Sequence, residues 1–340
     1  MKKRRASPGR TRHRRGAYTK QPADHGALGT ERRNPRSLAL DRMSTTAILR
    51  LMNDEDRRVP EAVRREIPRI ARVVDEVIRA IRAGGRVIYV GAGTSGRIGL
   101  LDALEWPPTF GVSPDLVKAI VAGGAQATIG SAAASEDDRV EGRAQIAAAL
   151  VSPRDVVIGI AASGVTPFVL SAIEEARQRG VPVIGLSNVP GSPLAMMADI
   201  AITPDVGPEV LTGSTRLKAG TSQKLVLNMI GTAAMVRLGK VYSNLMVEMT
   251  PANRKLIDRA RRIVAAAAGL DEETSARLLD EAGGNAKVAI VMALRGIGRG
   301  EAEERLRQTG GHVGDAVGKK PGSRRIAARR RPSEQHARHR

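Results

Sequence analysis

Five short apolar runs alternate with stretches of helical periodicity over residues 87–203. The runs are rich in β-branched side chains and are apolar throughout, at 87–90, 117–121, 156–160, 183–186 and 200–203. The stretches between them carry apolar residues at helical spacing, at about 96–104, 125–134, 138–149, 167–178 and 192–197. Fully apolar strands separated by helices are typical of a parallel sheet that is buried on both faces. The pattern therefore predicts an α/β fold, with a parallel sheet of about five strands.

Helical patterns also flank this region. The run Ser44-Thr45-Thr46 can cap a first helix, and a longer amphipathic helix ends near Ala83. Another long apolar helix runs to about Leu238, and after Pro251 every pattern is helical, at about 252–268, 271–282, 285–294 and 300–308. The chain is thus predicted to hold a sheet domain with N-terminal helices at 30–250 and a small helical domain at 251–317.

The net charge of +20 is concentrated at the two ends of the chain. Residues 1–36 hold twelve Lys and Arg against two acids, and residues 319–340 hold nine against one, which leaves only +2 for the rest. We expect residues 1–29 and 318–340 to be disordered, solvated basic tails, with weak polyanion binding as the alternative. Nucleic-acid binding by the folded part is not expected.

Composition excludes several kinds of chemistry. The sequence contains no cysteine, and four of its five histidines lie in the tails, so only His312 is left in the folded part. A cysteine nucleophile, a thiolate or multi-histidine metal site and a histidine triad are therefore not expected, and proton transfer falls to carboxylates, Lys or Tyr. No metal or cofactor is predicted.

We also expect no membrane contact and a cytoplasmic location. No run of about 18 apolar residues appears, and residues 1–36 lack the apolar segment of a secretory signal. An arginine-rich transit peptide, or a true start near residues 26–30, are alternative readings of the N-terminus.

A glycine-rich loop follows the first apolar run. It reads Gly91-Ala-Gly-Thr-Ser-Gly96 and leads into a helix, which is the arrangement that binds anions through backbone N–H groups and the helix dipole. Its G-x-G-x-x-G spacing also fits a dinucleotide fingerprint, but no acidic residue ends the next strand, since Asp115 lies before it. The hydroxyls of Thr94 and Ser95 favour a sugar phosphate. A plain strand-to-helix turn is the third reading.

A second loop of the same kind follows the third run. Ser163 and Thr166 precede a helix with Pro167 in its first turn, so both hydroxyls are candidate phosphate donors, and N-capping is the alternative role. Near the start of the later long helix, the positive charges of Arg216, Lys218 and Lys224 oppose the helix dipole. A bound anion would offset that cost, although a solvated charged turn is also compatible with the pattern.

Two glutamates on neighbouring connections are candidate acid–base groups. Glu105 is followed by Trp106-Pro107-Pro108, and we expect the prolines to end the helix there and the surroundings to desolvate the carboxylate. Glu136 follows the second strand, in Ser135-Glu136-Asp137. The alternative roles are an ordinary helix-end residue for Glu105 and part of a helix N-cap region for Glu136.

Several motifs together closely resemble the N-acetylmuramic acid 6-phosphate etherase family, over roughly residues 30–310. They include Thr30-Glu31, Gly91–Arg97, Glu105 with Pro107-Pro108-Thr109, Glu136-Asp137, Gly159–Gly164, Thr166-Pro167, Gly213-Ser214 and Lys218–Thr221. The resemblance implies a sugar-isomerase (SIS) type three-layer αβα sandwich, followed by a small C-terminal helical bundle. It also implies a homodimer with sites near the interface.

The resemblance further implies a lyase reaction. The D-lactyl ether of N-acetylmuramic acid 6-phosphate is cleaved by elimination and water addition, which gives N-acetylglucosamine 6-phosphate and D-lactate. By this resemblance Glu105 donates a proton to the leaving oxygen and Glu136 is the base at C2. The implied substrate-binding residues are Thr94, Ser95, Ser163, Thr166, Ser214 and Lys218. The alternatives are a sugar-phosphate isomerase and a non-catalytic, sugar-phosphate-sensing regulator on the same scaffold.

Overall fold

The computed structural model describes residues 28–129, 133–249 and 254–318. Almost all of both predicted basic tails, and Pro251 at the predicted domain boundary, therefore lie outside the described residues.

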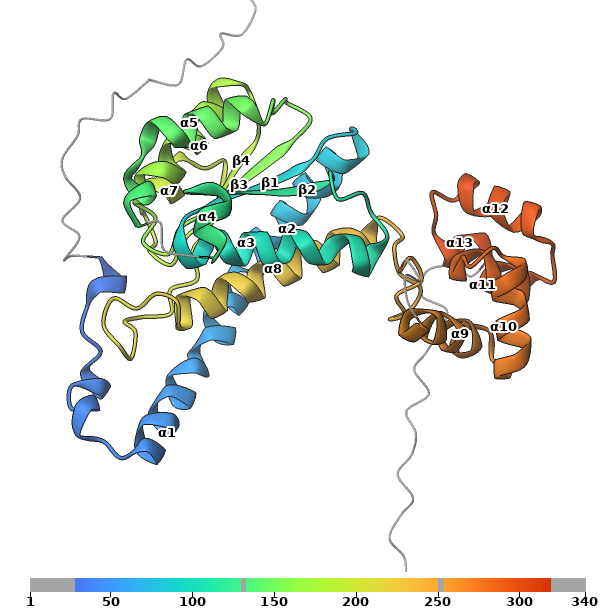
Figure 1. The fold of residues 1–340 in the computed structure, drawn as a ribbon, viewed down its shortest axis with the longest axis horizontal. Helices are drawn as coiled ribbons and strands as arrows, with labels where there is room; N and C mark the ends of the chain where they lie inside the picture. Colours follow the sequence, from blue (N-terminus) through green and yellow to red (C-terminus); the bar gives the residue numbers. More distant parts are fainter. Residues whose placement is uncertain (1–27, 130–132, 250–253, 319–340) are drawn as a thin grey trace, which may run out of the picture.

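A five-stranded parallel sheet forms the centre of the larger part of the chain (Figure 1). Its strands are β1 Val87–Gly91, β2 Val117–Val121, β3 Val156–Ile160, β4 Val183–Leu186 and β5 Ile200–Ile202. Every residue of β1, β3 and β4 is buried, as continuous apolar runs predict. The sequence prediction of a parallel sheet of about five strands is confirmed.

The strand order β2-β1-β3-β4-β5 reverses direction at β1. Gly91, the last residue of β1, pairs with Val121 of β2 on one side and with Ile160 of β3 on the other. The loops that follow β1 and β3 therefore leave the sheet side by side. This is the switch point at which open parallel sheets bind ligands.

Helices cover both faces of the sheet (Figure 1). On one face lie α2 Arg58–Arg82, α3 Gly93–Phe110 and α8 Lys218–Arg237, which share a hydrophobic core with Tyr89 and Ile158. On the other face α5 Arg139–Ala148, α6 Pro167–Gln178 and α7 Pro193–Met197 pack on Ile88 and Val157. Successive strand residues point to opposite faces, which produces two apolar layers and the predicted three-layer sandwich.

Short 3-10 turns and one helix precede α2. The turns are η2 Gly29–Glu31, η3 Pro35–Ser37 and η4 Leu40–Arg42, and the helix is α1 Thr45–Asp56. The Ser44 hydroxyl accepts a hydrogen bond from the Ala47 N–H at 3.3 Å, so the predicted capping run is confirmed and Ser44 is its N-cap residue.

The prediction that the prolines end the first sheet helix at Glu105 is wrong. Helix α3 continues through Pro107 and Pro108 to Phe110 and ends at Gly111, whose φ is +62°. Trp106 and Phe110 are buried side chains whose rings make an edge-to-face contact at 6.4 Å. Burying both rings favours the extra turn over the local cost of the prolines.

The predicted helix at 125–134 is also wrong as a single element. The structure has α4 Gly124–Ile129 and a separate 3-10 turn, η5 Ala133–Asp137, with residues 130–132 outside the described part. Glu136 therefore lies on the turn η5, and in the predicted N-cap region of residues 136–138 it is Asp138 that caps the next helix, by accepting a hydrogen bond from the Glu141 N–H.

The C-terminal part consists of helices with a hydrophobic core of their own. They are α9 Arg254–Ala268, α10 Glu272–Glu281, α11 Ala286–Arg295, α12 Arg299–Gln308 and α13 Val313–Ala316. Val264 and Ile290 are fully buried at the centre of this core, which confirms the small helical bundle. Among the described helices, none has the length and apolarity needed to cross a membrane.

Candidate functional site

A cavity of about 340 Å³ lies at the switch point of the sheet. The loops after β1 and β3 form two of its walls, and residues from η2, η5 and the segment before α8 complete it. Its polar lining consists of Glu31, Thr94, Ser95, Arg97, Glu136, Ser163, Thr166 and Thr215. The structure therefore brings together five of the residues that the sequence singled out: the two hydroxyl pairs and Glu136.

The first loop is formed by close contact between β1 and α3. A Cβ atom on Gly91 would lie 2.6 Å from the backbone nitrogen of Gly96, so a side chain is excluded at that position. The first turn of α3 places Thr94 and the buried Ser95 at the cavity, and the methyl side chain of the N-cap residue Ala92 cannot accept a hydrogen bond from the helix. This helix N-terminus therefore favours an anion in the cavity.

The second loop turns at Gly164, whose φ is +70°. A Cβ atom there would lie 2.2 Å from the Ser192 hydroxyl, so only glycine fits. Thr166 occupies the N-cap position of α6, yet its side chain makes no capping hydrogen bond. Ser163 Oγ accepts a long hydrogen bond, 3.4 Å, from the Val165 N–H. The alternative capping role of Thr166 is thus not observed, and both side chains line the cavity.

Glu136 reaches the start of α3 from the turn η5. Its Oε1 atom would lie 2.7 Å from a Cβ atom on Gly93, so the carboxylate packs directly over that glycine. Burial raises the pKa of Glu136, and the neighbouring charge of Asp137 adds to the rise, whereas Arg97 opposes it. Arg97 itself donates two hydrogen bonds to the Ala127 carbonyl, at 2.9 and 3.1 Å. A half-buried carboxylate with a raised pKa is suited to act as a base near neutral pH.

Glu105 does not line this cavity, although the sequence paired it with Glu136. It lies eleven residues beyond Thr94 on the same helix, which is roughly 16 Å along the axis. Its side chain is exposed, contrary to the expected desolvation. Leu101 and Leu104, on the same face of α3, are 47% and 63% exposed. Within one chain, Glu105 and Glu136 are therefore not a pair.

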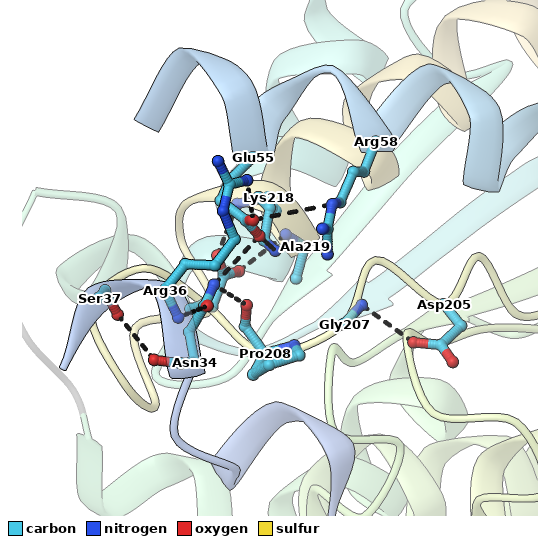
Figure 2. A network of polar contacts seen from close by, with 11 residues as sticks. Asn34, Arg36, Ser37, Glu55, Arg58, Asp205, Gly207, Pro208, Lys218 and Ala219 are labelled. Carbon is cyan, nitrogen blue, oxygen red and sulfur yellow. Dashed lines mark hydrogen bonds and ion pairs between the residues drawn. The ribbon is translucent and has the colours of Figure 1, made fainter. Parts of the chain in front are cut away.

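Lys218 and Ser214 also lie outside the cavity lining, where the neighbouring Thr215 takes part instead. Lys218 is 1% exposed, and its Nζ donates to Glu55 Oε2 at 2.7 Å (Figure 2). The Glu209 carboxylate accepts the backbone N–H groups of Lys218 and Ala219, at 3.1 and 2.9 Å. The negative charge inferred at the start of α8 is thus supplied by two carboxylates of the protein itself, Glu55 and Glu209.

Lys224, the other cation on α8 that the sequence singled out, is likewise engaged within the chain. Its Nζ contacts Asp102 at 3.4 Å and Asn228 at 2.6 Å.

Glu31, Arg97 and Thr215 also line the cavity, although no functional role was predicted for them from the sequence. Glu31 and Arg97 belong to the motifs of the family resemblance, which was the only sequence signal for them. Neither Glu31 nor Thr215 directly follows a strand, and no pattern in the sequence marks either of them as a ligand-binding residue. Within the described ranges, there is no group of three or more His, Asp or Glu side chains that could hold a metal ion.

The fold and this cavity define a protein of the SIS class. The family model of the SIS domain matches residues 141–233, and that of the glucokinase regulatory protein N-terminal SIS domain matches residues 69–177. A solved phosphoheptose isomerase from Neisseria gonorrhoeae has a TM-score of 0.44 and is 18% identical, over 56% of this chain and 97% of that one.

Curated relatives specify the family. N-acetylmuramic acid 6-phosphate etherase from Symbiobacterium thermophilum is 55% identical over 79% of this chain and 90% of its own length. The enzymes of the same name from Rubrobacter xylanophilus and Serratia proteamaculans are 53% and 50% identical, each over 86% of this chain and 97% and 98% of their lengths. The chain belongs to the N-acetylmuramic acid 6-phosphate etherase family.

Proposed function

We propose that this chain is a carbon–oxygen lyase that cleaves the D-lactyl ether of N-acetylmuramic acid 6-phosphate, acting in the cytoplasm on a product of cell-wall breakdown. The observation that carries the proposal is the Glu136 carboxylate, packed over Gly93 in the same cavity as four hydroxyl side chains from two strand-to-helix loops. The identity of about 50% to enzymes of that name supports the substrate.

The two loops are suited to hold the phosphate. Thr94 and Ser95 lie in the first turn of α3, and Ser163 and Thr166 precede α6. Both helix N-termini direct backbone N–H groups and a positive dipole end toward the cavity. The phosphate is thus bound by hydroxyl and backbone donors.

Glu136 is the proposed base at C2. In the open-chain aldehyde the carbonyl acidifies the C2 proton, so a carboxylate with a raised pKa can remove it. The C3–O bond then breaks, D-lactate leaves, and an α,β-unsaturated aldehyde remains. Water adds at C3 and a proton returns to C2, which gives N-acetylglucosamine 6-phosphate. A positioned acid or base contributes about 10²–10⁴-fold to such a step.

Glu105 remains the proposed proton donor to the leaving oxygen, but in the cavity of a partner subunit and not in that of its own chain. It is exposed and roughly 16 Å along α3 from the loop of its own chain, so it cannot touch a sugar bound there. Exposed Leu101 and Leu104 flank it on one face. We propose that a second copy covers this face in a homodimer, so that Glu105 enters the partner's cavity.

The activity is tested by D-lactate release from N-acetylmuramic acid 6-phosphate, coupled to D-lactate dehydrogenase. The full-length chain should release lactate, and Glu136→Gln should be slower by at least about 100-fold. Aldose–ketose conversion without lactate would support the isomerase alternative. Binding of the phosphosugar without any turnover would support a regulator, the alternative that the match to a glucokinase regulatory protein domain favours.

Mixing two inactive variants tests the shared site separately. A heterodimer of Glu105→Gln and Glu136→Gln subunits has one intact site only if Glu105 serves the partner. Random mixing should then restore about a quarter of the wild-type activity. No recovery, with exchange of subunits verified, would place both residues in the same site or remove Glu105 from the mechanism.

A further inference from the structure

Glu31 is a second carboxylate in the cavity of the same chain, and the mechanism above gives it no role. It ends the 3-10 turn η2 and approaches the cavity from the N-terminal segment. A Cβ atom on Gly213, in the segment before α8, would lie 3.2 Å from Glu31 Oε2. Glu136 approaches over Gly93 instead. The two carboxylates thus come from different elements and rest on different parts of the cavity wall.

The fold holds this turn in place through Asn34, three residues further along. The Asn34 side chain is 3% exposed and donates to Glu55 Oε2 at 3.0 Å and to the Pro208 carbonyl at 3.2 Å (Figure 2). Its own Oδ1 accepts the Arg36 N–H at 2.9 Å. Because Glu55 is in turn paired with the buried Lys218, the segment that carries Glu31 is fixed to α1 and α8. The position of Glu31 at the cavity follows from these contacts.

The carboxylate of Glu31 is available to a ligand. Nearby acids are engaged, since Glu55 is paired with Lys218 and Arg36, and Asp54 with Arg36 and Arg57. Glu31 is an exposed residue that lines the cavity, and within the described part of the chain no lysine or arginine is paired with it. A carboxylate accepts hydrogen bonds and donates none when ionised.

Charge decides which part of the proposed substrate such an acceptor can contact. The phosphate on C6 and the carboxylate of the lactyl group on C3 are both anions, which a carboxylate repels. Between them the open-chain sugar carries neutral hydroxyls on C4 and C5, and these are hydrogen-bond donors. Glu31 suits that middle part of the chain, while Glu136 is directed to C2.

We propose that Glu31 is a substrate-contacting residue, which accepts hydrogen bonds from the C4 and C5 hydroxyls and so fixes the sugar between the phosphate loops and the base. The inference rests on the proposed phosphosugar substrate. It makes the N-terminal segment part of the binding site and Glu31 a determinant of specificity for hydroxyl-bearing sugar phosphates over smaller phosphates.

The test compares two competitive inhibitors of lactate release, N-acetylglucosamine 6-phosphate and inorganic phosphate. Glu31→Ala should raise KM and the inhibition constant of N-acetylglucosamine 6-phosphate by about 10–100-fold, as expected for losing hydrogen bonds to a charged acceptor. It should leave inhibition by inorganic phosphate unchanged. Ser163→Ala should weaken both inhibitors, and Glu61→Gln, an exposed glutamate of α2, should change neither.

Three outcomes would overturn the inference. They are unchanged inhibition by N-acetylglucosamine 6-phosphate, equal weakening of both inhibitors, or a large fall in kcat with binding unaffected. Glu31→Gln, which retains one acceptor oxygen, should fall between wild type and Glu31→Ala and guards against misfolding of the alanine variant. If the wild-type chain releases no lactate, the proposed function fails, yet calorimetric binding of the same two ligands still decides the role of Glu31.

Discussion

Replacing Lys218 by methionine removes one partner of a fully buried ion pair. Lys218 Nζ lies 2.7 Å from Glu55 Oε2, and the two side chains are 1% and 0% exposed. Breaking such a pair costs about 3–5 kcal/mol, because the remaining charge stays buried. Arg36 Nη1 still lies 2.8 Å from Glu55 Oε1, so we expect the lower end, about 3 kcal/mol.

Urea unfolding followed by tryptophan fluorescence measures this effect. Trp106 is the only tryptophan of the sequence and is 2% exposed in the core shared by α3 and α8, so it reports on the sheet domain. With an m-value of about 3 kcal/mol/M, the loss lowers the midpoint by about 1 M. Arg64→Met, which removes an exposed pair with Glu61, is the matched control and should leave the midpoint unchanged. Equal midpoints for the two variants would refute the reasoning.

The difference in unfolding free energy between wild type and Lys218→Met should change with pH in a definite direction. Burial alone would raise the pKa of Glu55, but hydrogen bonds from Lys218, Arg36 and Asn34 hold it below its ordinary value of 4.5. The stabilisation is therefore fully present above that value and is lost as the pH falls through the lower, folded-state pKa. The difference in unfolding free energy between wild type and Lys218→Met should therefore become smaller in acid. A larger difference in acid would contradict the stabilising role of the Lys218–Glu55 ion pair.

Three further predictions concern the cavity and the core beneath it. Ser163→Ala should raise KM by about 10–100-fold with a smaller change in kcat, measured by lactate release, because it removes a donor to an anionic phosphate. Asp137→Asn should move the acidic limb of the pH profile of kcat/KM to lower pH, because Asp137 contributes to the raised pKa of Glu136. Gly231→Ala should destabilise the sheet domain by about 1–3 kcal/mol in urea unfolding, since its Cβ would lie 2.8 Å from Trp106 Nε1.

The sheet could be predicted from the sequence because its signal is local. Each strand is a continuous apolar run, and the observed bounds of β2, β3 and β4 match the predicted runs. The end of α3 could not be predicted from its prolines. Pro107 and Pro108 weaken the helix locally, but the burial of Trp106 depends on α8, which lies far along the chain. Tertiary packing outweighed the local preference there.

The candidate site, too, could be predicted from the sequence only in part. The hydroxyl loops follow strands whose order reverses at β1, so a general rule for parallel sheets brings Thr94 and Ser163 together. Lys218 was predicted to bind the substrate, and its charge at the start of α8, which opposes the helix dipole, suggested a bound anion there. The carboxylates that neutralise that position come from Glu55 and Glu209, and Glu55 lies 163 residues away. No window of sequence shows that pairing.

The same buried network links stability to binding, which allows one last prediction. Asn34 donates to Glu55, and Glu55 accepts from Lys218, so the turn that carries Glu31 is held from α8. Loosening it should disturb the contact of Glu31 with the sugar, although Lys218 itself lies outside the cavity. Lys218→Met, assayed well below its unfolding midpoint, should therefore weaken inhibition by N-acetylglucosamine 6-phosphate, but less than Glu31→Ala does. Inhibition by inorganic phosphate should stay unchanged, because the hydrogen bonds of this network join Asn34, Glu55 and Lys218 and do not include Thr94 or Ser163. If Lys218→Met lowered the affinity for both inhibitors alike, the network would support the whole domain rather than the Glu31 segment.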